Sequence, residues 1–128
     1  MCLNKITRRK GLKQSGVGYV VGAYCNKKEM RGCYHDTIYR LGRWYKAKKA
    51  MKIVIGRMAP IYDYEPGFHI FTNLNDAYVY AEVIIRPVTI YTVKWDNPIV
   101  RGKTVVPWTT RRLSCIVARR RKITGVAE

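Results

Sequence analysis

Apolar residues alternate with polar ones, or run together, in several short parts of the chain, a pattern typical of β-strands. Six segments show it: residues 16–25, 51–58, 67–71, 87–95, 99–106 and 113–123. Turn-forming residues separate them, among them Gly42, Gly56 and the triplet 96–98 (Asp-Asn-Pro). The pattern predicts a mainly antiparallel sheet of about five or six strands.

One further segment shows helical periodicity. Its apolar side chains fall at steps of three and four residues and predict one buried stripe: Leu74, Ala77, Tyr78, Ala81 and Ile85. Thr72 or Asn73 can cap the helix, because their side-chain oxygens accept N–H groups of its first turn. Asp76 suits that turn electrostatically, and Pro87 ends the helix.

A chain of 128 residues has room for one domain with its own core. The order of elements predicts an α+β fold in which one main helix packs on a face of the sheet. Residues 1–13 are basic and without periodicity, so we expect an N-terminal arm that is either mobile or an edge segment of the sheet. Residues 14–128 then form the single α+β domain, with a basic last strand.

Charge is the outlying property of the composition. Twenty-five Lys and Arg residues against eight Asp and Glu leave a net charge of +17. Residues 1–57 carry +13 and residues 101–128 carry +7, while residues 58–100 carry −3. A small fold with this charge repels itself unless an anionic partner neutralises it. Nucleic acid is the commonest such partner, followed by anionic membranes and acidic protein surfaces.

Cationic side chains near aromatic ones mark the candidate binding surface, since cations neutralise phosphates and rings stack on bases. The predicted polyanion-binding residues are Arg8, Arg9, Lys10, Arg43, Trp44, Lys46, Lys48, Lys49, Lys52, Arg111, Arg112, Arg119, Arg120, Arg121 and Lys122. In a strand, Arg119 and Arg121 project to one face and Arg120 and Lys122 to the other. This alternation favours a tail or a sheet edge over one flat binding surface. Motifs for sequence-specific readout, such as a zinc finger, are not visible.

Other chemistry is weakly supported. Cys25, Cys33 and His35 lack the paired short spacings of a zinc site, so we expect free thiols and neither metal nor cofactor. His69 lies in an apolar segment and is expected to be hydrogen-bonded in the core, the alternative being a general base. We assign no catalytic residue. The basic start has no apolar segment of a secretory signal, and no apolar run reaches the length of a membrane span.

A succession of segments resembles a group of small, uncharacterised proteins encoded by bacteriophages and prophages. The segments are YRLGRWYKA at 39–47, YEPGFHIFTNLNDA at 64–77 and IYTVKW at 90–95, followed by Gly102 and IVAR at 116–119. In that group a Gly-Phe-His segment opens a unit of strand, cap and helix. The resemblance implies a phage origin and this fold, and it transfers no functional residue.

A weaker resemblance is to ADP-ribosyltransferase-like domains. These have a strand that ends in Ser or Thr and a helix with an A-x-x-Y motif; the matching positions are Thr72, Ala77, Tyr80 and Ala81. Such enzymes also use a glutamate on a later strand, and after Glu82 the only acidic residues are Asp96 and Glu128. The resemblance implies either such an enzyme or an inactive relative.

Three functions follow as hypotheses. The first is a non-enzymatic phage-type accessory protein in the cytoplasm of the bacterial host, which binds nucleic acid or a host nucleoprotein complex through its charge, in host takeover or counter-defence. The second is a virion component, a minor capsid or internal protein that contacts DNA or acidic subunits. The third is the ADP-ribosyltransferase-like enzyme. The sequence leaves the oligomeric state open.

Overall fold

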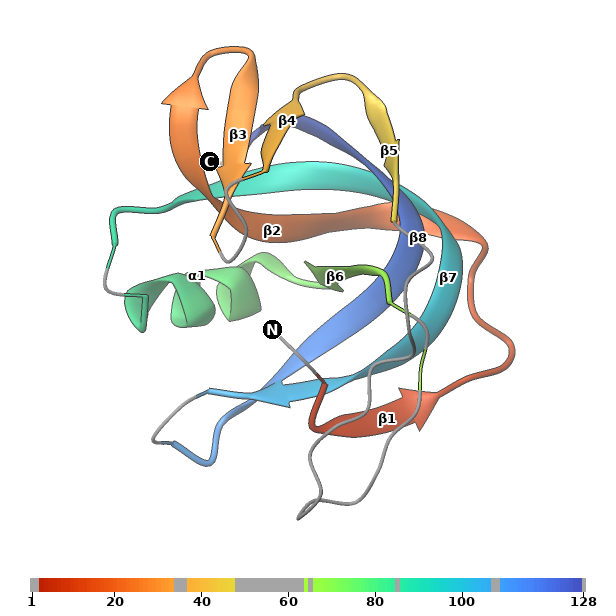
Figure 1. The fold of residues 1–128 in the computed structure, drawn as a ribbon. Coiled ribbons are helices and arrows are strands. Elements are labelled where there is room, and N and C mark those ends of the chain that lie inside the picture. Colours follow the sequence, from red (N-terminus) through yellow and green to blue (C-terminus); the bar gives the residue numbers. More distant parts are fainter. Residues whose placement is uncertain are drawn as a thin grey trace.

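The computed structural model describes residues 3–33, 37–47, 64, 66–84, 86–106 and 109–127. Within these ranges the chain forms eight strands and one helix (Figure 1): β1 Lys5–Arg8, β2 Ser15–Asn26, β3 Glu29–Gly32, β4 Ile38–Arg40, β5 Trp44–Lys46, β6 Phe68–Phe71, α1 Leu74–Glu82, β7 Thr89–Val105 and β8 Arg112–Val126. All strand pairs are antiparallel, which confirms the predicted α+β class. The predicted number of strands was too low, because strands of three or four residues leave little periodic signal.

Three long strands, β2, β7 and β8, form the centre of the sheet. β8 pairs with β7 along nearly its whole length, and β2 pairs with the first half of β7. β6 pairs with β8 and meets β2 at one residue pair, Tyr19 with Phe71. The strands β2, β7, β8 and β6 therefore close into a ring. β1 flanks the second half of β7, β3 and β4 extend the sheet from β2, and β5 lies beside β8.

Closure of this ring depends on a glycine in β2. A Cβ atom on Gly18 would lie 2.6 Å from the carbonyl oxygen of Phe71 and would also overlap the side chain of Ile70. Only a residue without a side chain lets the two backbones approach this closely. The glycines around Val20 therefore belong to sheet geometry, and β2 is the strand that the sequence predicts there.

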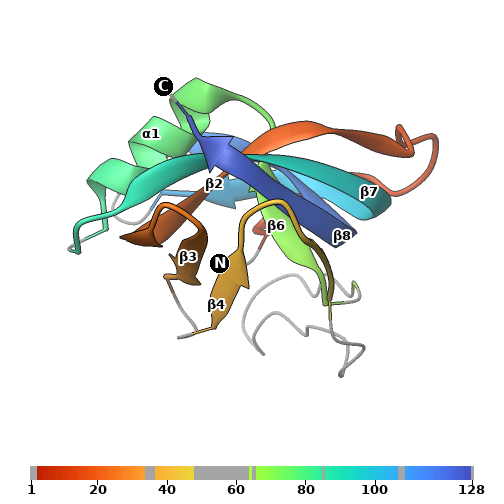
Figure 2. The same cartoon turned by 90° about the horizontal axis from the view of Figure 1, so that it is seen from above.

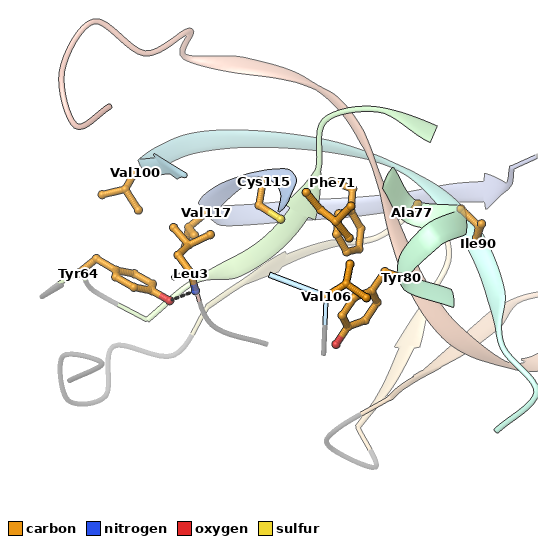
Figure 3. Packing of buried hydrophobic residues seen from close by; sticks show 11 residues of the cluster. Leu3, Tyr64, Phe71, Ala77, Tyr80, Ile90, Val100, Val106, Cys115 and Val117 are labelled. Carbon is orange, nitrogen blue, oxygen red and sulfur yellow. Dashed lines mark hydrogen bonds between the residues drawn. The ribbon is translucent and has the colours of Figure 1, made fainter. Parts of the chain in front are cut away.

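The sheet carries a hydrophobic cluster on each side. One cluster lies under α1 and includes Leu3, Phe71, Tyr80 and Val117 (Figure 3). The other lies on the side of β3 and β4 and includes Met30. Figure 2 shows α1 and these two strands on opposite sides of the sheet. Because both faces are covered, neighbouring residues of β6 and β8 are buried on opposite sides, as in the fully apolar strands that the sequence shows.

The N-terminus of α1 is tied to the sheet by polar contacts. The side-chain oxygen of Asn73 accepts the N–H of Asp76 at 2.8 Å, which settles the cap on Asn73. The carboxylate of Asp76 accepts the side-chain amide of Asn73 at 3.0 Å and the backbone N–H of Ser114 in β8 at 2.9 Å. The cap thus also fixes how the helix sits on the strand below it.

The buried stripe of α1 differs from the predicted one. Ala77 is fully buried as expected, but Tyr78 is 44% exposed and Tyr80 is 7% exposed. The ring of Tyr80 packs on Phe71, with ring centroids 5.2 Å apart. Contact with β6 below therefore decides which tyrosine faces the core. The helix ends at Glu82, and Ile85 lies outside the described residues.

The predicted turn at residues 96–98 is wrong, since β7 runs unbroken through it. Asn97 takes a positive φ of 53°, and the register shifts between Pro98 and Val100. A bulge of this kind admits proline and an unusual backbone angle while the strand bends and continues. The turn at Gly42 is present, with φ at 81°, and the predicted strand 51–58 lies outside the described residues.

Candidate polyanion-binding face

Four neighbouring strands in the order β2, β7, β8 and β5 direct one set of side chains outwards. Directly paired residues share a face of a sheet, so the register defines rows of side chains across it. One row is Val17, Lys94, Lys122 and Trp44, and the next is Ser15, Asp96, Arg120 and Lys46. We call these eight residues the cationic face. It carries four cations and one carboxylate.

Trp44 is the aromatic residue of this face and is 37% exposed. The guanidinium carbon of Arg120 lies 4.8 Å from the centroid of its ring, and the ammonium nitrogen of Lys122 lies 5.4 Å from it. Cations at this distance are attracted by the negative charge on the ring face. Both cations come from β8, so the indole is held against that strand while part of it remains open to solvent.

Asp96 supplies the negative charge of the face. One carboxylate oxygen lies 3.1 Å from the guanidinium of Arg120, and the side chains of Arg120 and Asp96 are 39% and 25% exposed. A pair this exposed stabilises the fold by at most about 1 kcal/mol. Its larger effect is on position, because Arg120 is held between the carboxylate on β7 and the indole on β5.

Arg121 points to the opposite side of the sheet and is 8% exposed. Its guanidinium carbon lies 4.6 Å from the ring centroid of Tyr39 and 4.2 Å from that of Phe68. Burial lowers the pKa of Arg121 to about 10, against a raising contribution from Tyr39. Its Nε atom has no hydrogen-bond partner among the described residues. Arg121 is therefore a residue of the core and not of the surface.

The basic run 119–122 also lies differently from the expected tail or sheet edge. β8 continues through it, with β7 on one side and β5 on the other. The predicted alternation is found for Arg120, Arg121 and Lys122, which point outwards, inwards and outwards. Arg119, expected on the side of Arg121, is half-buried in β8, and its carbonyl oxygen accepts the N–H of Ala47. A central strand with one cationic face is the result, and the sequence did not reveal this because the pairing partners are distant in the chain.

The remaining predicted cations lie elsewhere. Arg43 is exposed in the turn between β4 and β5. Exposed cations also flank the second half of β7, where Arg8 of β1 pairs with Arg101 and Arg112 of β8 pairs with Val105. Arg9, Lys10 and Arg111 are exposed next to these strands, and Lys48, Lys49 and Lys52 lie outside the described residues. The predicted patch is thus divided between two ends of the sheet.

Sequence reasoning missed four members of the cationic face, Ser15, Val17, Lys94 and Asp96, of which two illustrate the reason. Lys94 lies in the least basic block of the chain, and only the alternation of residues 87–95 signals that it is exposed. Val17 is 62% exposed although it lies in an apolar segment. Both become recognisable only when the register of β2 and β7 is known.

His69 is hydrogen-bonded in the protein interior, as the sequence predicts. The hydroxyl of Tyr64 accepts the backbone N–H of Leu3 at 3.1 Å and lies 3.0 Å from Nε2 of His69 (Figure 3 shows the first of these contacts). The hydroxyl hydrogen is then free to be donated to a neutral imidazole. Burial lowers the pKa of His69 to about 4, which keeps the ring neutral at physiological pH.

Of the four residues matching the ADP-ribosyltransferase pattern, two lie in the core and two are half-buried. Ala77 and Tyr80 belong to the cluster under α1, and the hydroxyl of Thr72 contacts the carbonyl oxygen of Ser114 at 3.5 Å. Ala81 packs at the border of the same cluster. Three of these side chains thus pack in or beside the core, and that of Thr72 contacts β8.

The three cysteines that the structure describes are free thiols: Cys25 is exposed, Cys33 half-buried and Cys115 buried, while Cys2 lies outside the described residues. Burial raises the pKa of Cys33, whose thiol contacts the carbonyl oxygen of Val21 at 3.3 Å, and raises that of Cys115 to about 12. Within the described ranges no three His, Cys, Asp or Glu side chains are grouped as metal ligands; His35 lies outside those ranges. Likewise, none of the described residues forms a helix long and apolar enough to cross a membrane.

Comparison of the chain with protein-family models, curated proteins and solved structures gives no match.

Proposed function

We propose that this chain is a non-enzymatic, phage-type accessory protein that binds nucleic acid through the cationic face. The observation that carries the proposal is the row arrangement of Lys94, Lys122, Arg120 and Lys46 around an exposed tryptophan. The setting we propose is the cytoplasm of a bacterial host, where such a protein acts in host takeover or counter-defence.

The charge of the face supports a polyanionic partner. Four cations on three adjacent strands, with strands about 4.8 Å apart, place positive charges at short and regular intervals. Backbone phosphates are the ligands that such an array neutralises, and these contacts position a nucleic acid without selecting its sequence. The composition agrees, because the chain as a whole carries +17 and has much charge to neutralise.

The salt dependence of binding follows from the geometry. Four cations less one carboxylate correspond to about three phosphates, so log K falls with log salt with a slope of about −2.7 on duplex DNA. Fluorescence anisotropy of a labelled random-sequence oligonucleotide at several salt concentrations measures this slope. In the triple variant Lys46→Ala, Lys94→Ala, Lys122→Ala we expect this slope to fall close to zero.

A control variant removes two positive charges elsewhere. Lys27 and Lys28 are exposed in the turn between β2 and β3, at the other end of β2 from the cationic face. The variant Lys27→Ala, Lys28→Ala should change the slope by much less than the triple variant. Equal effects of both variants, or no binding at low salt, would overturn the proposal. Binding to polyglutamate and not to the oligonucleotide would instead indicate an acidic protein partner.

A further inference from the structure

We infer that the preferred ligand of the cationic face is single-stranded nucleic acid, one base of which stacks on the indole of Trp44. The inference rests on the proposed function and narrows it to one ligand class. It arises from the position of Trp44, which is surface-exposed at the end of a row of cations. The ring contacts that the structure gives for Trp44 are to the two cations Arg120 and Lys122, and 37% of the residue is open to solvent.

The rows of the sheet set the size of the site. Side chains on one face of a strand repeat at about 6.7 Å, and four strands span about 14 Å. Two rows therefore cover an area that a few nucleotides fill. Proteins that bind single strands without sequence preference combine such a charged surface with an aromatic platform for bases.

Stacking requires the flat face of a base, which a duplex keeps covered by its neighbours. A duplex offers the cationic face only its phosphates, whereas a single strand offers phosphates and an open base together. The surroundings of Trp44 can bind both the phosphates and the open base. Arg120 and Lys122 contact its ring from β8, and the same two cations lie in the rows that receive the backbone.

The two cations also order the indole ring of Trp44 before a ligand binds. Because Arg120 is fixed between Trp44 and Asp96, the indole is held in place before a ligand arrives. A platform that is already ordered loses little conformational entropy on binding. The carboxylate of Asp96 serves as a positioning group for Arg120 and does not contact the ligand.

The experiment compares two probes of the same length, a deoxythymidylate oligomer and a random-sequence duplex. Trp44→Ala should weaken binding of the single strand by about 5- to 150-fold, the range expected when one stacked base is lost, and leave duplex binding within about twofold. Trp44→Phe, which keeps an aromatic ring and guards against loss of the fold, should show a smaller loss. Tyr78→Ala, which removes a similarly exposed ring on α1, should change the binding of neither probe.

Fluorescence gives an independent measurement, since a stacked base quenches an indole. Quenching by the deoxythymidylate oligomer should disappear in Trp44→Phe, although two of the three tryptophans of the chain remain. Equal losses for both probes in Trp44→Ala, or unchanged quenching in Trp44→Phe, would overturn the inference and leave the proposed function standing. Failure of both probes to bind the unmodified protein would overturn both.

Discussion

The guanidinium carbon of Arg121 lies 4.2 Å from the ring centroid of Phe68, inside the protein, while the side chains before and after it point to solvent. A cation in this position is stabilised by the aromatic ring but loses its hydration, and its Nε atom is unpaired among the described residues. The opposing contributions make the charge itself of small net value to stability.

Replacement of Arg121 tests this balance. Arg121→Met keeps a long side chain that packs well on aromatic rings, so its free energy of unfolding should lie within about 1 kcal/mol of the original value or above it. Arg121→Ala leaves a cavity and should lose about 2–5 kcal/mol. Urea unfolding followed by circular dichroism measures both. A loss in Arg121→Met as large as that in Arg121→Ala would show that the charge is required.

Gly18 should tolerate no side chain. In Gly18→Ala the new methyl group meets the carbonyl oxygen of Phe71, so β2 and β6 must separate, and we expect a loss of about 1–3 kcal/mol in the free energy of unfolding. Gly125→Ala is the matched control, because a Cβ atom there meets nothing within 4 Å. Thermal unfolding of the two variants should differ clearly, and similar midpoints would contradict the account of ring closure.

Stability should fall in mild acid because of His69. Its pKa is lowered from 6.5 to about 4 in the folded protein, so between these values the unfolded chain binds a proton that the folded chain does not. The contribution of His69 to the free energy of unfolding is complete above pH 6.5. It decreases as the pH falls towards 4, by up to about 1.4 kcal/mol per pH unit. Urea unfolding at several pH values measures it.

The variant His69→Gln should flatten this part of the pH profile. The other histidine, His35, remains in both proteins, so any dependence that it contributes is common to them. An unchanged slope between pH 4 and 6.5 would assign the acid sensitivity to other groups.

Thiol reactivity should separate the cysteines by burial. The thiolate is the reactive form of cysteine. Cys115 is buried, and burial raises the pKa of its thiol to about 12. Cys25 is exposed. Titration of the native protein with a thiol reagent should therefore lose a fast phase in Cys25→Ser and remain unchanged in Cys115→Ser. Rapid labelling of Cys115 without denaturant would disagree with the buried position.

Local sequence patterns predicted the elements that depend on local chemistry. Asn73 caps α1, Gly42 makes a turn, and the apolar segments in β2, β6, β7 and β8 are strands. Patterns failed where a distant strand decides the outcome. The triplet 96–98 has turn chemistry, yet pairing with β8 keeps it in a bulged strand. Tyr80 replaces Tyr78 in the core because Phe71 lies beneath it.

The candidate site shows the same division. Composition and the basic runs pointed to Trp44, Lys46, Arg120 and Lys122, which the structure brings together. Sequence patterns could not exclude Arg121 from the surface, since its burial depends on Tyr39 and Phe68. Arg8 and Arg112 could not be placed either, because only the pairing of β1 and β8 with β7 locates them at another end of the sheet.

The ring of strands closes between β2 and β6 at one residue pair, Tyr19 with Phe71, while β2 and β7 are joined by eight. Transient opening of the ring is therefore expected at β6, the connection with the fewest contacts. Such opening leaves the pairing of β2, β7, β8 and β5 intact. Local opening between β2 and β6 is therefore not expected to change the distances between the side chains of the cationic face.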